Sequence, residues 1–111
     1  MLRRKLIPVL SVLFLLPFIA QSQITTSAMG GLVKTNTGEP LVGAIIKATH
    51  EPTGTVYKVQ SRTGGRFDIA NMNNGGPYTI EVSFLNFAVE KKTDVYLNLG
   101  ETFKIDITLF P

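Results

Sequence analysis

The chain has 111 residues, no cysteine, one histidine and a formal net charge of +3. This length allows one compact domain, and without cysteine the domain cannot use the disulfide bonds on which small exported domains often depend. Three of the eleven basic residues lie at positions 3–5, and the other eight equal the acidic residues in number. The rest of the chain therefore has no excess of positive charge, which argues against nucleic acid or an anionic membrane surface as a partner.

The first predicted element is an export signal. The basic residues at 3–5 precede an apolar run at 6–20, and small and polar side chains follow. This order is typical of a secretory signal peptide. A membrane-spanning helix is the alternative, but it needs roughly 18 or more apolar residues, and two prolines interrupt this shorter run. We therefore predict a signal peptide at 1–22, a mature domain at 23–111 without a membrane-spanning segment, and export from the cytoplasm.

The mature chain alternates apolar and polar residues with a period of two, the pattern of β-strands that bury one face. The alternation is clearest at 78–84 and 103–109, which predicts two strands. Five further strands are predicted from shorter or weaker stretches, at 29–35, 44–49, 57–59, 67–69 and 89–97. Segments rich in Gly, Asn and Pro separate the stretches, as turns require. Short strands with turns about every 8 to 15 residues predict a seven-stranded antiparallel β-sandwich.

The segment GGRFDIANMNNGGPY at 64–78 contains two Gly-Gly pairs. A phosphate-binding loop would place its glycines between a strand and the start of a helix, followed by Lys and Ser or Thr. Here a strand pattern follows the second pair directly, and no such lysine is present. We predict that the first pair forms a hairpin turn ahead of Phe67, and that the second pair turns the chain into the strand that begins at Pro77.

The run at 30–87 resembles the carboxypeptidase regulatory-like domain, which is a transthyretin-like, Ig-like β-sandwich. The resemblance rests on the segments GLV, GEPLVGA, TGGRF and GPYTIEVSF. More narrowly, HEPTGTVY at 50–57 and GGPYTIEVSF at 75–84 are similar to the copy at the N-terminus of Oar-like TonB-dependent outer-membrane receptors. The chain departs from those receptors at Asn86, where they usually have glycine. Asparagine tolerates a left-handed backbone, so a turn is still expected there.

The resemblance implies a non-catalytic N-terminal extension of such a receptor, as a fragment or a truncated relative. The expected location is the periplasm, or the periplasmic face of the outer membrane, of a Gram-negative bacterium. The expected partners are the receptor plug and barrel or components of the TonB system, and the associated process is uptake of nutrients or siderophores.

The alternative is a free-standing periplasmic or cell-surface β-sandwich module that binds protein or carbohydrate. Its exposed edge strands would offer strand addition to an extended peptide. The FLNF turn at 84–87 offers a second contact, in which Phe87 is either an exposed anchor or a cap on the end of the sandwich. Phe84 is in phase with the core.

Catalysis is not expected from these residues. A catalytic zinc ion needs about three protein ligands, and a hydroxyl nucleophile needs a base beside it, whereas His50 is the one imidazole in the sequence. With Glu51 and Glu81, His50 would attract a cation only weakly, and a histidine at a strand end beside a turn is predicted to be a polar surface group. We assign no catalytic, cofactor-binding or metal-binding residue, and no cofactor.

Overall fold

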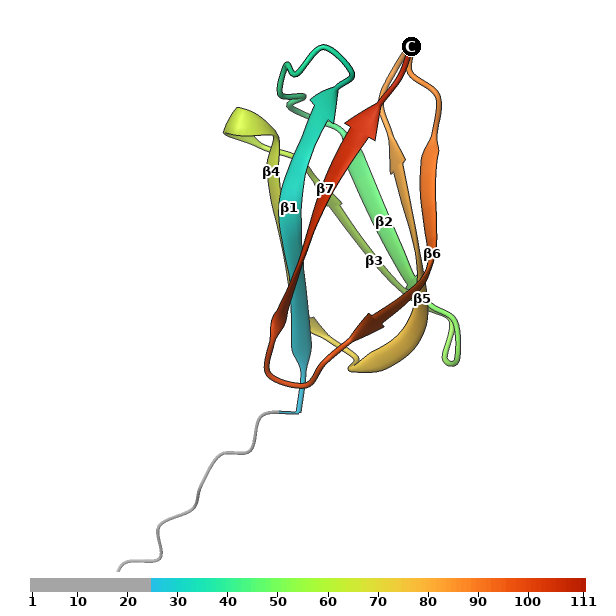
Figure 1. The fold of residues 1–111 in the computed structure, drawn as a ribbon. Helices are drawn as coiled ribbons and strands as arrows, with labels where there is room; N and C mark the ends of the chain where they lie inside the picture. The colour runs from blue at the N-terminus through green and yellow to red at the C-terminus, as the bar shows by residue number, and fades with distance from the viewer. Residues whose placement is uncertain (1–24) are drawn as a thin grey trace, which may run out of the picture.

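The computed structural model describes residues 25–111, and the signal peptide predicted at 1–22 lies outside them (Figure 1). The described residues form seven strands and a short 3-10 turn at Thr63–Gly65. The strands are β1 (Ser27–Thr35), β2 (Ile45–His50), β3 (Thr55–Gln60), β4 (Arg66–Met72), β5 (Gly75–Ser83), β6 (Glu90–Leu97) and β7 (Thr102–Leu109). Each coincides with a stretch of predicted alternation, so the all-β class is confirmed. Within residues 25–111, no helix has the length and hydropathy needed to cross a bilayer.

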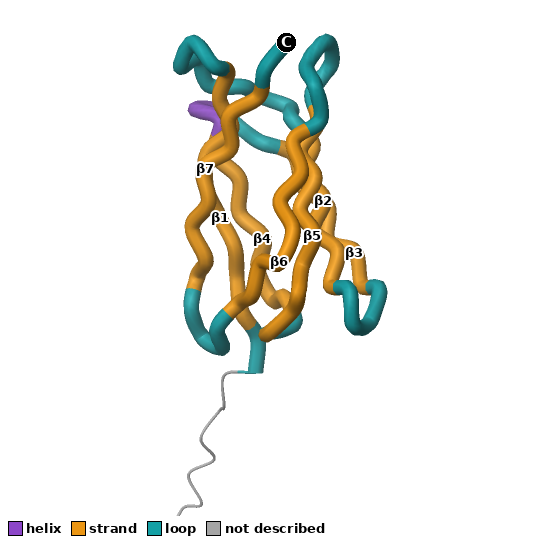
Figure 2. Tube along the Cα trace, turned by 45° about the vertical axis from the view of Figure 1, so that its right-hand side comes forward, coloured by secondary structure: helices purple, strands orange, loops and turns teal. Residues whose placement is uncertain are grey.

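The strands form two sheets that pack face to face as a sandwich (Figure 2). Sheet A has three strands in the order β4-β1-β7, and sheet B has four in the order β3-β2-β5-β6. All neighbouring pairs are antiparallel except β1 and β7, which run parallel from the pair Ala28 and Thr102 to the pair Thr35 and Leu109. The predicted sandwich is therefore confirmed, with the first and last strands as one parallel pair.

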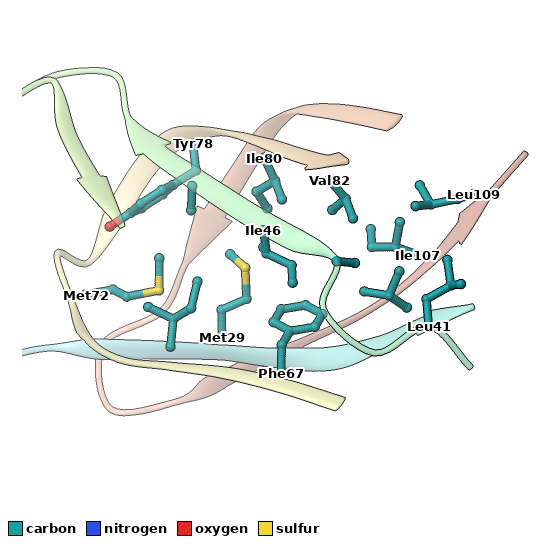
Figure 3. Close-up of a cluster of buried hydrophobic side chains, with 14 of the residues drawn as sticks. Met29, Leu41, Ile46, Phe67, Met72, Tyr78, Ile80, Val82, Ile107 and Leu109 are labelled. Atoms are coloured by element: carbon teal, nitrogen blue, oxygen red, sulfur yellow. The ribbon is translucent and has the colours of Figure 1, made fainter. Parts of the chain in front are cut away.

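Both sheets direct alternate side chains into one core (Figure 3). On β5, Tyr78, Ile80 and Val82 are fully buried, and the residues between them face outward. Phe67 of β4 is 1% exposed and lies across the core from Ile46 of β2. Burial of one large apolar side chain contributes about 1.5–3 kcal/mol, so a core of this kind explains how the domain holds together without disulfides.

The first Gly-Gly pair forms a turn, but not a hairpin. The Arg62 N–H donates to the Arg66 carbonyl oxygen and the Gly65 N–H donates to the Arg62 carbonyl oxygen, both at 2.8 Å. The turn connects β3 of sheet B with β4 of sheet A, so the chain changes sheets here and the predicted hairpin is wrong. Gly65 has a φ of +76°, and a Cβ on it would lie 2.4 Å from the Val33 carbonyl oxygen. Glycine alone satisfies both constraints.

The second Gly-Gly pair lies within β5 and not in the turn before it. Gly75 pairs with Leu97 of β6, and the bend lies one residue earlier, at Asn74. The prediction that these glycines turn the chain is therefore wrong by about one residue. A strand and not a helix follows them, as predicted, so the helix N-terminus that a phosphate-binding loop requires is absent from this segment.

Candidate functional site

Two aromatic side chains build the turn that links β5 to β6. The Phe87 N–H donates to the Phe84 carbonyl oxygen at 3.0 Å, and the two rings meet edge to face with 5.8 Å between their centroids. Asn86 has a φ of 71°, the left-handed conformation expected at this position. Both rings are partly buried and pack against the core. Phe87 therefore caps the end of the sandwich and does not project as an anchor.

Leu85 projects from this turn in place of Phe87. Its side chain is 82% exposed. Three more large hydrophobic residues, each more than half exposed, lie at the same end of the sandwich: Val42, Val89 and Phe110. We call these four residues the apolar end. In Figure 1 it is the end at which residue 111 lies, opposite residue 25.

The segments of the apolar end lie close to one another. The Ala88 N–H, beside Val89, donates to the Phe110 carbonyl oxygen at 2.8 Å. A Cβ on Gly43, next to Val42, would lie 4.0 Å from the Phe84 ring. Exposed apolar residues at one end of a domain are a candidate surface for contact with other macromolecules. The four side chains carry no ionisable group, so the apolar end is suited to contact and not to chemistry.

A polar aromatic cluster occupies the opposite end of sheet B. The Tyr78 hydroxyl donates to the Asn73 carbonyl oxygen, and the Asn73 N–H donates to the Tyr57 hydroxyl oxygen at 3.0 Å. The His50 Nδ1 atom lies 2.7 Å from Thr53 Oγ1. The Tyr57 and Tyr78 ring centroids are 6.2 Å apart. Each of these polar groups has a partner inside the domain, which indicates a structural role.

His50 is buried, with 7% of its surface exposed, so the prediction of a polar surface group is wrong. The physical reason is the phase of β2. Ile46 and Ala48 face the core, and position 50 continues the same alternation. The alternation at 46, 48 and 50 could have predicted this burial from the sequence. The prediction instead followed the position of His50 at a strand end, next to the turn at 51–54.

The weak cation site considered at His50 is not formed. Glu51 is exposed in the turn after β2, and Glu81 lies on the outward-facing side of β5. Within the described part of the chain, no group of three or more His, Cys, Asp or Glu side chains is placed to hold a metal ion.

Burial raises the pKa of the Tyr78 phenol well above its usual range, and the neighbouring Tyr57 raises it further. The raised pKa keeps the phenol protonated, so it remains the donor to the Asn73 carbonyl oxygen. A buried, protonated hydroxyl group with its hydrogen bond already made is suited to holding the β4–β5 connection in place.

A sequence model of the carboxypeptidase regulatory-like domain matches residues 28–110, from β1 through β7. The chain belongs to this family. The regulatory-like domain accounts for nearly all of the described residues, including the apolar end and the cluster around His50. The search of curated proteins finds no significant match.

Solved structures share the fold of this regulatory-like domain at low sequence identity. A hydroxyquinol 1,2-dioxygenase from Pseudomonas putida has a TM-score of 0.63 and 9% identity, over 82% of this chain and 58% of that one. A minor pilin of Streptococcus agalactiae has a TM-score of 0.62 and 13% identity, over 78% and 44%. A protein of Bacteroides uniformis named as carbohydrate-binding has a TM-score of 0.58 and 21% identity, over 76% and 41%. The chain thus spans about half the length of these proteins, and the likeness concerns the fold alone.

Proposed function

We propose that this regulatory-like domain is the non-catalytic N-terminal extension of a TonB-dependent outer-membrane receptor, as a fragment or a truncated relative. The segments at 50–57 and 75–84 support the proposal, because both are similar to the corresponding copy in Oar-like receptors. The domain would lie in the periplasm or on the periplasmic face of the outer membrane. Its partner would be the receptor plug and barrel or a TonB-system component, during uptake of a nutrient or siderophore.

The apolar end is the observation that carries this proposal. Leu85, Val42, Val89 and Phe110 expose hydrophobic side chains at the same end of the sandwich. Strand β7 ends beside that surface, because the backbone of Phe110 accepts the hydrogen bond from Ala88. A plug domain attached after β7 would lie next to the apolar end and would bury it.

A non-catalytic role agrees with the interior of the domain. The His50 Nδ1 atom and the Tyr78 hydroxyl group are engaged in internal hydrogen bonds. The dioxygenase whose structure is similar has 9% sequence identity, and proteins with one fold often differ in function. Its activity therefore does not transfer to this chain.

Site-specific crosslinking tests the proposal. A photoreactive amino acid in place of Leu85 is expected to crosslink to the receptor plug or barrel, or to a TonB-system component, in outer-membrane fractions. The crosslinked peptides are identified by mass spectrometry. The matched control is the same probe in place of Leu99, which is 51% exposed in the turn between β6 and β7. Equal crosslinking from the two positions would contradict the proposal. So would the absence at Leu85 of peptides from the plug, the barrel and the TonB system.

The second candidate is a free-standing periplasmic or cell-surface module that binds protein or carbohydrate. The fold similarity to a pilin and to a protein named as carbohydrate-binding supports it at the level of the fold. Under this candidate, the exported product is recovered at its own size. Crosslinks from Leu85 then lead to an unrelated partner and not to plug or barrel peptides.

A further inference from the structure

Three of the four edge strands carry features that discourage the addition of another strand. The pairing of β6 with β5 has two register irregularities, and Asp94 on β6 has a φ of 58°. The pairing of β4 with β1 is also irregular, and Asn71 on β4 has a φ of 56°. Strand β7 presents charges of both signs on its outer face, at Lys104 and Asp106.

Strand β3 has neither an irregular register nor a residue with positive φ. It pairs with β2 in unbroken register from Thr55 to Gln60, and it contains no proline, no residue with positive φ and one charged residue, Lys58. Val56 is 52% exposed on the outer face. A hollow of about 560 Å³ lies at this edge, lined by Ile45, Lys58, Val59 and Gln60. Figure 2 shows β3 at the margin of sheet B.

The outer face of sheet B places two lysines opposite each other at this edge. Lys58 of β3 pairs directly with Lys47 of β2, which pairs on its other side with Glu81 of β5. Glu81 in turn pairs with Lys91 of β6. These four cross-strand neighbours form one row across sheet B, and the row contains three lysines and one carboxylate. Directly opposed like charges destabilise a sheet. Within residues 25–111, the ion pair that forms is away from this row, between Arg62 in the connection before β4 and Asp68 of β4.

We propose that the edge of β3 binds an extended, acidic segment of a partner protein by strand addition. An added strand that places a carboxylate opposite Lys58 offsets the excess positive charge of the row. Because residues two apart lie on the same face of a strand, the next outward residue of the partner faces Val56 and is expected to be apolar. A second copy of β3, with the sequence TVYKVQ, supplies no carboxylate. This inference does not depend on the proposed receptor.

Synthetic peptides test the proposal directly. The probe is a terminally blocked peptide of alternating Val and Thr with one central Glu, and the matched peptides have Gln or Lys in its place. In a titration of the purified ¹⁵N-labelled protein, we expect the Glu peptide to shift the amide signals of 55–60. We expect it to bind about tenfold or more tightly than the Lys peptide, with the Gln peptide between them.

Charge reversal at Lys58 provides the second arm of the test. Lys58→Glu places an acidic residue opposite Lys47, which preserves the fold, and we expect it to reverse the peptide preference so that the Lys peptide binds more tightly. Lys104→Glu, the same change on β7, is the control and is expected to leave the preference unchanged. The proposal is overturned if the three peptides bind alike, if the shifted signals belong to β6 or β7, if none of the peptides binds, or if the protein self-associates through β3.

Discussion

The His50 ring lies against the Tyr78 ring, with 4.9 Å between the ring centroids and 58° between the ring planes. The two residues pair directly across β2 and β5, and both are buried. Cross-strand aromatic pairs of this kind stabilise a sheet. The one histidine of the chain therefore belongs to the folded core.

Replacement of His50 by alanine removes this ring contact and the hydrogen bond to Thr53. We expect His50→Ala to lower the free energy of unfolding by about 1–3 kcal/mol, measured by urea denaturation. Glu51→Ala, at the exposed neighbouring position, is the control and is expected to change it little. Equal midpoints for the His50 variant and the wild-type protein would show that the pair does not stabilise the fold.

The stability of the domain is expected to fall at high pH because of Tyr78. Burial raises the pKa of its phenol above the value of about 10 that an unfolded chain has. Between these two pKa values the unfolded state loses its proton first, so the free energy of unfolding decreases by up to about 1.4 kcal/mol per pH unit above pH 10. Below pH 10 this contribution is fully present.

Tyr78→Phe separates this effect from other titrations. The variant loses the hydrogen bond to Asn73, and we expect it to be about 1 kcal/mol less stable at pH 7. Above pH 10, its free energy of unfolding is expected to fall less steeply than that of the wild-type protein. The free energy of unfolding of both proteins is measured by urea denaturation at several pH values. If it falls equally steeply with pH for the two proteins, Tyr78 is not the cause of the loss of stability.

Phe67 is expected to be a main contributor to the core, because its ring is 1% exposed between the two sheets. Phe67→Ala should lower the free energy of unfolding by about 3–5 kcal/mol. Leu99→Ala, at a position that is 51% exposed, should change it by less than about 0.5 kcal/mol. A thermal midpoint unchanged by the Phe67 substitution would remove this residue from the core.

The turn before β4 offers a comparison of two neighbouring glycines. Gly64 has a φ of +81°, and a Cβ on it would meet only the Arg66 Cγ atom, at an ordinary contact distance of 4.0 Å. Gly65 combines a φ of +76° with a Cβ position 2.4 Å from the Val33 carbonyl oxygen. Gly64→Ala should cost about 1–2 kcal/mol of backbone strain. Gly65→Ala should cost about 4 kcal/mol or more, since β1 must also move. Calorimetry of both variants checks the difference, and equal losses would mean that the contact with Val33 is unimportant.

The sequence was sufficient to predict which face of each strand is buried, but not which strands pair with each other. Alternation identifies which side chains of β5 and β7 point inward, since a strand repeats every two residues. It carries no information about which strands pair or in which direction, so the parallel pair of β1 with β7 and the change of sheet at Gly65 emerged from the structure. Both depend on contacts between residues far apart in the sequence.

The candidate site was predictable in part. The FLNF segment at 84–87 indicated a turn with aromatic residues, but local sequence does not determine which of its side chains packs inward. Phe87 packs inward because a neighbouring ring, that of Phe84, is available to it. Leu85 lies two residues after the end of β5 and is exposed, in the same phase as the outward-facing residues of that strand. The lysine pair at 47 and 58 required the register of β2 with β3.

Fractionation of cells that express the gene at its natural level, with an antibody to residues 25–111, tests the central claim most directly. The account predicts a product without its signal peptide, in the outer-membrane fraction or attached to its periplasmic face, in association with a receptor plug and barrel. Detection in the cytoplasm, with the first 22 residues still attached, would contradict it.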